Sequence, residues 1–187
     1  MPSCKPMKLF SGKFVDPWVL TKDDIKIADI AHSLSNQCRW GGHVQKFYSV
    51  AEHCVRVCNL SASYGSSKYE QLSCLLHDAT EAYITDLPRP VKWQLLDYCV
   101  LEDQIAVMIN EVFGVDICTP HVKGVDQQMC AIEARDLMGI RNGEWEKFLP
   151  EPLECYHIYS TLSPEEVRAQ FYSTYINLTE EIARCQK

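Results

Sequence analysis

From about residue 25 onward, apolar residues recur at the spacing of an α-helix, and this pattern restricts the chain to a mainly helical fold. In segment 27–37, Ile27, Ile30 and Leu34 fall on one helix face. Further helices are predicted at about 49–60, 69–84, 91–96, 98–113, 121–138 and 163–184. Glycine and proline separate these segments. The sequence therefore predicts an all-α protein.

Local signals mark several helix ends. Ser49, with Glu52 three residues later, predicts a capping box at the start of one helix, and Ser163-Pro164-Glu165-Glu166 predicts another for the terminal helix. Gly114 is placed to end helix 98–113 in the left-handed conformation. Residues 140–162, which contain two prolines, are expected to be irregular.

Strand signal is confined to the first 20 residues. Segment 9–19 has the pattern of a short hairpin around Ser11-Gly12. Repeats and linkers are absent, and 187 residues suffice for one core. We therefore expect one helical domain over residues 1–187.

Composition excludes some classes of function. The chain is 47% hydrophobic, and its 18 basic and 25 acidic residues give a formal net charge of -7. An acidic protein of this size is a poor ligand for duplex nucleic acid, which is bound by neutralising phosphates. No apolar run approaches the ~20 residues needed to cross a bilayer. Residues 1–10 lack a signal-peptide pattern, so a cytoplasmic protein without membrane partners is expected.

The sharpest chemical feature is His77-Asp78, which interrupts the apolar run of a predicted helix. A buried carboxylate needs a partner, because burying it unpaired is costly. Two partners satisfy this requirement. The pair can be hydrogen-bonded internally, or it can bind a divalent metal ion.

Other acidic and histidine side chains favour the metal. Glu81 lies one helical turn after His77, His53 follows the start of the preceding helix, and Asp126 lies near the start of a later one. A set of two histidines and two aspartates suits one Mn²⁺, Co²⁺, Mg²⁺, Fe²⁺ or Zn²⁺ ion. Four protein ligands on an octahedral ion leave two positions open, as catalysis requires.

The order His53, His77-Asp78, Asp126 resembles the HD-domain metal-dependent phosphohydrolase superfamily. The blocks FYSVAEHC (47–54), LLHDATEAYITDLPRPVK (75–92) and VKGVDQQMCAIEARDLM (122–138) are similar to those of bacterial 5′-deoxynucleotidases and phage dATP triphosphohydrolases. The likeness covers about residues 10–140 and leaves 141–187 as a C-terminal extension. It implies that His53, His77, Asp78 and Asp126 bind the metal and, by analogy, that the protein is a homo-oligomer.

The resemblance also implies roles for other residues. Glu81 and Asp86 match the acidic pair that orients or deprotonates the attacking water, and Arg39 and Trp40 match a pair that contacts phosphate and sugar. Trp40 can equally be a core residue.

Residues outside the matched pairs can also bind substrate. Lys92 is a candidate phosphate ligand, with Arg89 and Lys46 as weaker candidates. His43 can bind phosphate or a ribose hydroxyl, or be a surface histidine.

The expected reaction is hydrolysis of the Pα–O5′ ester of 2′-deoxynucleoside 5′-phosphates. The chain offers only a few candidate cations, and this small number favours monophosphate substrates. A triphosphohydrolase acting on dATP is the alternative. A cyclic-dinucleotide phosphodiesterase would need more histidines between His77-Asp78 and Asp126, where only His121 occurs. An HD fold that has lost catalysis and only binds ligands is a further alternative, although every matching histidine and acid is present.

Overall fold

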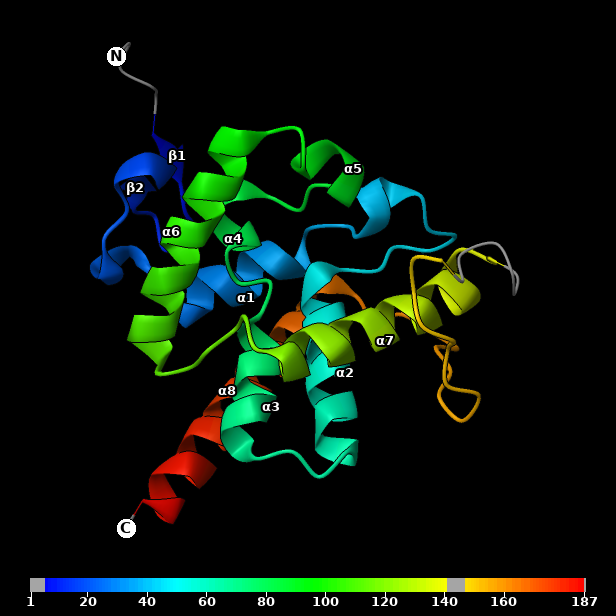
Figure 1. Ribbon diagram of the computed structural model, residues 1–187. Coiled ribbons are helices and arrows are strands. Elements are labelled where there is room, and N and C mark those ends of the chain that lie inside the picture. The colour runs from blue at the N-terminus through cyan, green and yellow to red at the C-terminus, as the bar shows by residue number, and fades with distance from the viewer. Residues whose placement is uncertain (1–5, 141–146, 187) are drawn as a thin grey trace.

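The computed structural model describes residues 6–140 and 147–186, and its regular structure is almost entirely helical (Figure 1). The α-helices are α1 (Ile27–Ser35), α2 (Val50–Ser63), α3 (Lys68–Leu76), α4 (Glu81–Ile84), α5 (Arg89–Lys92), α6 (Leu96–Phe113), α7 (Pro120–Leu137) and α8 (Pro164–Cys185). Short 3₁₀ helices cover η1 (Pro17–Val19), η2 (Lys22–Asp24) and η3 (Trp40–Gly42). The predicted all-α fold is confirmed.

The N-terminal hairpin is also confirmed, although it spans residues 7–15 and not the predicted 9–19. Strand β1 (Met7–Lys8) pairs antiparallel with β2 (Phe14–Val15), and the turn contains Gly12 at a φ of 90°. Residues 17–19 were predicted within the hairpin but form η1 instead. Proline lacks a backbone N–H donor and favours the first position of a helix, while the Asp16 side chain caps η1 by accepting from the Trp18 N–H.

Helix α2 lies at the centre of the bundle and packs against α1, α3, α7 and α8 (Figure 1). Each of these helices contributes fully buried side chains to one core; examples are Leu34, Val57, Leu75, Met129 and Phe171. Helix α8 therefore belongs to the same core as the motif-bearing helices, although it lies beyond the motifs in sequence.

Most predicted helix ends agree with the structure. Gly114 ends α6 in the left-handed conformation, and the Ser163–Glu166 capping box starts α8. The box at Ser49 is only half formed, because Ser49 accepts from the Glu52 N–H while the Glu52 carboxylate binds Arg56 and the Leu162 N–H.

One predicted helix is misplaced. Residues 91–96 do not form a helix of their own, since α5 covers residues 89–92 and α6 begins at Leu96. Of the segment predicted to be irregular, residues 147–162 contain neither helix nor strand, while 141–146 lie outside the described residues. Within 6–140 and 147–186, no helix is both long and apolar enough to cross a membrane.

Asp24 joins the hairpin to the helices. One carboxylate oxygen lies 2.5 Å from Lys13 Nζ, and the other accepts from the Thr21 N–H and hydroxyl at 2.8 and 2.7 Å. The Tyr83 hydroxyl donates to the Asp24 backbone carbonyl. Burial alone would raise the pKa of Asp24, but the contacts with Lys13 and Thr21 outweigh it and lower the pKa to about 2.

We expect Asp24→Asn to lower the free energy of unfolding by about 1–2 kcal/mol at pH 7, because the ionised carboxylate is hydrogen-bonded only in the folded state. A lowered pKa stabilises the fold above the unfolded-state value of about 4. This stabilisation is lost as the pH falls through about 2. Urea unfolding between pH 7 and 3 should show the difference in unfolding free energy between wild type and variant narrowing below about pH 4. The control is the neighbouring exposed Asp23→Asn, and a gap that does not change with pH would contradict the assignment.

Candidate metal centre

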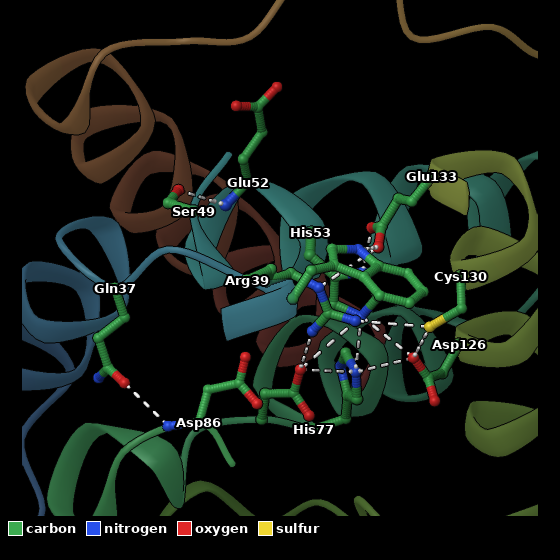
Figure 2. Close-up of polar contacts among 12 residues, drawn as sticks. Gln37, Arg39, Ser49, Glu52, His53, His77, Asp86, Asp126, Cys130 and Glu133 are labelled. Atoms are coloured by element: carbon green, nitrogen blue, oxygen red, sulfur yellow. Dashed lines mark hydrogen bonds and ion pairs between the residues drawn. The ribbon is translucent and has the colours of Figure 1, made fainter. Parts of the chain in front are cut away.

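Three segments that are far apart in sequence bring the predicted ligands together. Helix α2 supplies the fully buried His53, the end of α3 supplies His77 and the adjoining Asp78, and the second turn of α7 supplies Asp126. The close-up shows the side chains converging on one region between the helices (Figure 2). The packing of α2 against α3 and α7 therefore creates the cluster.

Four donor atoms of this cluster lie within 4 Å of their neighbours. His53 Nε2 is 3.2 Å from His77 Nε2, 3.1 Å from an Asp126 oxygen and 3.7 Å from an Asp78 oxygen. His77 Nε2 is 3.3 Å from the same Asp78 oxygen and 3.7 Å from the same Asp126 oxygen. These separations match donors that share one ion, since metal–ligand bonds of about 2 Å place neighbouring ligand atoms roughly 3 Å apart.

The tautomers of both histidines follow from their second nitrogens. His77 Nδ1 lies 2.8 Å from the Cys74 carbonyl oxygen, which only accepts, so Nδ1 carries the proton. His53 Nδ1 lies 2.5 Å from the carboxylate of Glu133 and is protonated for the same reason. In the neutral rings both Nε2 atoms are then unprotonated, and their lone pairs stand 3.2 Å apart. A cation between them removes this repulsion, so the donor set fits a metal ion.

The charges around the cluster also favour a cation. Burial alone would lower the pKa of His77, but Asp78 and the other neighbours outweigh it and raise the pKa well above its usual value. Burial alone would raise the pKa of Asp126, yet His53 and His77 lower it well below the usual value. The cluster thus stabilises positive charge beside ionised carboxylates. His53, His77, Asp78 and Asp126 lie close enough to hold a metal ion.

The predicted continuous helix 69–84 is wrong, and the break falls at the candidate metal ligands His77 and Asp78. Helix α3 ends at Leu76, and the next turn uses tighter bonds, such as Ala79 N–H to the Leu76 carbonyl. The His77 ring occupies the Cys74 carbonyl, which the Asp78 N–H would bind in a regular α-helix. Asp78 therefore leaves the helical path, and its carboxylate reaches the Nε2 atoms of both histidines.

Glu133 is a central residue of the site that we did not predict from the sequence. It is fully buried on α7 and binds His53 and Tyr48 through one oxygen, and Arg39 and Trp40 through the other. Burial alone would raise the pKa of Glu133, but His53 and Arg39 lower it to about 2.

A sequence signal for Glu133 did exist. It lies seven residues, or two helical turns, after Asp126, and so on the same face of α7. An acidic residue at that position within an apolar stretch is the kind of buried charge that needs a partner.

The two predicted water-handling acids, Glu81 and Asp86, follow the candidate ligands His77 and Asp78 in the chain. Glu81 begins α4 and is buried, and its Oε2 is one of two buried side-chain polar atoms in the described part of the chain without a hydrogen-bond partner. Burial, together with Asp78 and Asp86, raises the pKa of Glu81 well above its usual value. Burial also raises the pKa of Asp86, against the opposing effect of Arg39. Both acids therefore have environments that favour holding a proton.

Gln37 holds the loop that connects these two acids. Its amide nitrogen donates to the Glu81 carbonyl at 3.0 Å, and its amide oxygen accepts from the Thr85 hydroxyl and from the Asp86 N–H, both at 3.1 Å. Figure 2 shows the bond to Asp86. Thr85 has φ 68° and ψ 156°, a region almost reserved for glycine, where strain costs about 1–3 kcal/mol. The Tyr98 hydroxyl also donates to the Thr85 carbonyl. These bonds hold a strained turn whose next residue is Asp86.

The predicted cations occupy different places around the cluster. Arg39 is largely buried and binds Asp78 at 3.0 Å and Glu133 at 3.3 Å. Lys92 binds Glu102 at 2.5 Å. Burial alone would lower the pKa of Lys92, but Glu102, and more weakly Glu81 and Asp78, raise it. Arg89, ranked lower from the sequence, lies 3.2 Å from Asp126 and is half exposed. Lys46 is exposed.

The predicted substrate loop forms η3 and lies near Pro88. Trp40 is half-buried, and its indole N–H donates to Glu133 at 3.1 Å. Trp40, Gly41 and Gly42 all have positive φ, which explains the two glycines without a close ligand approach. His43 is exposed next to Gly41. Arg39 and Trp40 thus join the metal site through Glu133, while His43 stays on the surface.

The chain is similar to two curated bacterial proteins. The uncharacterized protein YfdR of Escherichia coli (strain K12) is 38% identical over 177 residues, which cover 93% of this chain and 96% of YfdR. The uncharacterized protein RCAP_rcc00048 of Rhodobacter capsulatus is 32% identical over 177 residues, which cover 88% of this chain and 90% of RCAP_rcc00048. No family model matches the sequence.

We expect Glu133→Gln to weaken Mn²⁺ binding by about 10- to 100-fold, because the neutral amide no longer orients His53 or increases its basicity. Isothermal titration calorimetry of metal-free protein measures the change. Glu52→Gln is the matched control, since Glu52 is also buried but faces Arg56 and Leu162. Equal Mn²⁺ affinity in wild type and Glu133→Gln would show that this contact does not support the site.

Proposed function

We propose that this chain, which belongs to the family that includes YfdR of Escherichia coli and RCAP_rcc00048 of Rhodobacter capsulatus, is an HD-type metal-dependent phosphohydrolase. Its proposed reaction is hydrolysis of 2′-deoxynucleoside 5′-monophosphates to the deoxynucleoside and phosphate. The proposal depends above all on two facing histidine Nε2 atoms, 3.2 Å apart, beside carboxylate oxygens of Asp78 and Asp126.

The chemistry of the surrounding residues supports hydrolysis over simple metal storage. His53, His77, Asp78 and Asp126 would hold a divalent ion, which would supply Lewis-acid chemistry to the phosphate ester. Glu81 and Asp86 are carboxyls with raised pKa values, which suits acceptance of a proton near neutral pH. One of them takes the proton from the attacking water. The Pα–O5′ bond then breaks as the water oxygen bonds to Pα, and the same carboxyl donates its proton to the leaving O5′ oxygen.

The cations near the centre favour a substrate with one phosphate. Arg39 is already bound by Asp78 and Glu133, and Lys92 by Glu102. Arg89 is half exposed beside Asp126 and is the most accessible of the three guanidinium or ammonium groups. A triphosphate carries more negative charge than a monophosphate and calls for more free cations. We therefore place deoxynucleoside monophosphates ahead of dATP.

A purely binding role is a weaker explanation of the same residues. Glu81 is buried with an oxygen that has no hydrogen-bond partner, and Thr85 is strained beside Asp86. Such costs persist where surrounding structure sustains them and are common at functional sites. A protein that only binds a ligand would not need both a buried carboxylate oxygen without a partner and a strained turn at the same site.

A substrate panel tests this proposal. Deoxy- and ribonucleotides at the mono-, di- and triphosphate level are incubated with the protein and Mn²⁺, Co²⁺, Mg²⁺ or Zn²⁺. We expect free phosphate from deoxynucleoside monophosphates and no turnover in Asp78→Ala, whose helical circular dichroism is retained. Intact triphosphate as the product would favour the dATP alternative. Full activity in Asp78→Ala, or no turnover of any nucleotide, would contradict the proposal.

Gln37 provides a second test, through the placement of Asp86. We expect Gln37→Leu to lower kcat by about 10- to 100-fold with a small change in KM, because small misplacements of a catalytic group cost this much. Steady-state kinetics on the best monophosphate substrate measures both constants. Gln170→Leu, at an exposed position on α8, is the control. A change in KM alone would assign Gln37 to substrate binding.

A further inference from the structure

A buried thiol lies beside the proposed metal ligands. Cys54 follows His53 on α2 and is fully buried. The potential ligand atoms of Cys54, His77 and Asp78 lie within 4.8 Å of one another, as do those of His53, His77 and Asp126. The cluster therefore contains two sets of donors, one with a sulfur and one without, and both include His77.

The two sets cannot bind separate ions at the same time. His77 has one nitrogen available, Nε2, because Nδ1 donates to the Cys74 carbonyl. One lone pair binds one ion, so whichever ion takes Nε2 uses donors from one set or the other. Asp78 is compatible with both arrangements, since its oxygen lies 3.3 Å from His77 Nε2 and 3.7 Å from His53 Nε2.

We propose that the centre has two alternative ion positions, selected by the ligand preference of the ion. An ion that prefers oxygen and nitrogen, such as Mn²⁺, binds His53, His77, Asp78 and Asp126. An ion that prefers sulfur, such as Cd²⁺ or Zn²⁺, replaces His53 and Asp126 with Cys54. This inference rests on the metal centre of the proposed function and not on its substrate.

Ligand chemistry supports this division. Thiolate binds soft and borderline ions far better than it binds Mn²⁺ or Mg²⁺. When the metal–sulfur bond forms, the thiol S–H bond breaks and its proton leaves to solvent, so no oxidant or reductant is needed. Cys54, His77 and Asp78 then form a mixed sulfur, nitrogen and oxygen set of the kind that zinc accepts.

The second thiol near the centre is a poorer ligand. Cys130 Sγ lies 3.3 Å from an Asp126 oxygen and 3.4 Å from an Arg39 nitrogen. Among the described residues, Cys130 belongs to neither of the two groups of potential ligand atoms, whereas Cys54 belongs to one. Cys58 lies one turn further along α2, and the described residues around it form no metal-binding group with it. These two cysteines are therefore matched controls.

The test uses the ultraviolet charge-transfer absorption that forms when Cd²⁺ binds a thiolate. Metal-free protein is prepared in a background in which four cysteines, the exposed Cys118, Cys155 and Cys185 together with Cys4, are replaced by serine. We expect one equivalent of Cd²⁺ to produce the band. Cys54→Ser should abolish it and weaken Cd²⁺ binding by at least about tenfold. Cys58→Ser and Cys130→Ser should retain it.

Mn²⁺ binding, measured by electron paramagnetic resonance, completes the test. We expect Cys54→Ser and the parent protein to bind Mn²⁺ equally, and Mn²⁺ in excess to suppress the Cd²⁺ band. A band that persists in Cys54→Ser, or disappears only in Cys130→Ser, would overturn the inference. Cys54→Ala, with its circular dichroism, provides a second variant in case serine disturbs the fold. Failure of the nucleotide panel with a Cys54-dependent band would reject the hydrolase but leave the two ion positions standing.

Discussion

The close approach of α2, α3 and α7 is the constraint on which the proposed chemistry depends. It places His53 and His77 with their Nε2 atoms 3.2 Å apart, beside the carboxylates of Asp78 and Asp126. Both Nδ1 atoms face acceptors, so neither ring can turn its lone pair away without losing a hydrogen bond. The packing of the three helices therefore fixes two facing lone pairs, and a cation between them would relieve their repulsion.

Glu133 extends this constraint to the substrate side. One buried carboxylate binds His53, Tyr48, Arg39 and Trp40, so the metal ligand and the predicted phosphate-binding arginine share a single partner. A buried charge of this kind needs every one of its hydrogen bonds, because an unpaired donor or acceptor in the core is costly. We therefore regard the Arg39–Trp40 loop and the metal ligands as one unit.

The acid pair is held in a different way. Gln37 and Tyr98 bind a turn in which Thr85 has a backbone conformation that is costly for a β-branched residue. Gln37 offsets that cost through its bonds with the Glu81 carbonyl, the Thr85 hydroxyl and the Asp86 N–H. Its amide nitrogen also donates to the Ser33 hydroxyl, which ties the loop to α1. Cys54, which follows His53 on α2, places a sulfur within 4.8 Å of potential ligand atoms of His77 and Asp78.

Much of the fold could be predicted from the sequence, because the signals for helices, helix caps and turns lie in residues that are close together in the chain. The all-α fold, the caps at Gly114 and Ser163 and the turn around Gly12 depend on neighbouring residues and were confirmed. The helices predicted at 69–84 and 91–96 were wrong in their extent. The candidate ligands were also visible, since His77-Asp78 is a polar pair in an apolar run.

What only the tertiary structure decided is how those groups meet. The roles of Gln37 and Glu133 arise from contacts between residues 44 to 94 positions apart. The break of the helix at His77 arises from a ring that competes for a backbone carbonyl. Periodicity and spacing describe one helix at a time, whereas these features are set by the packing of several helices at once.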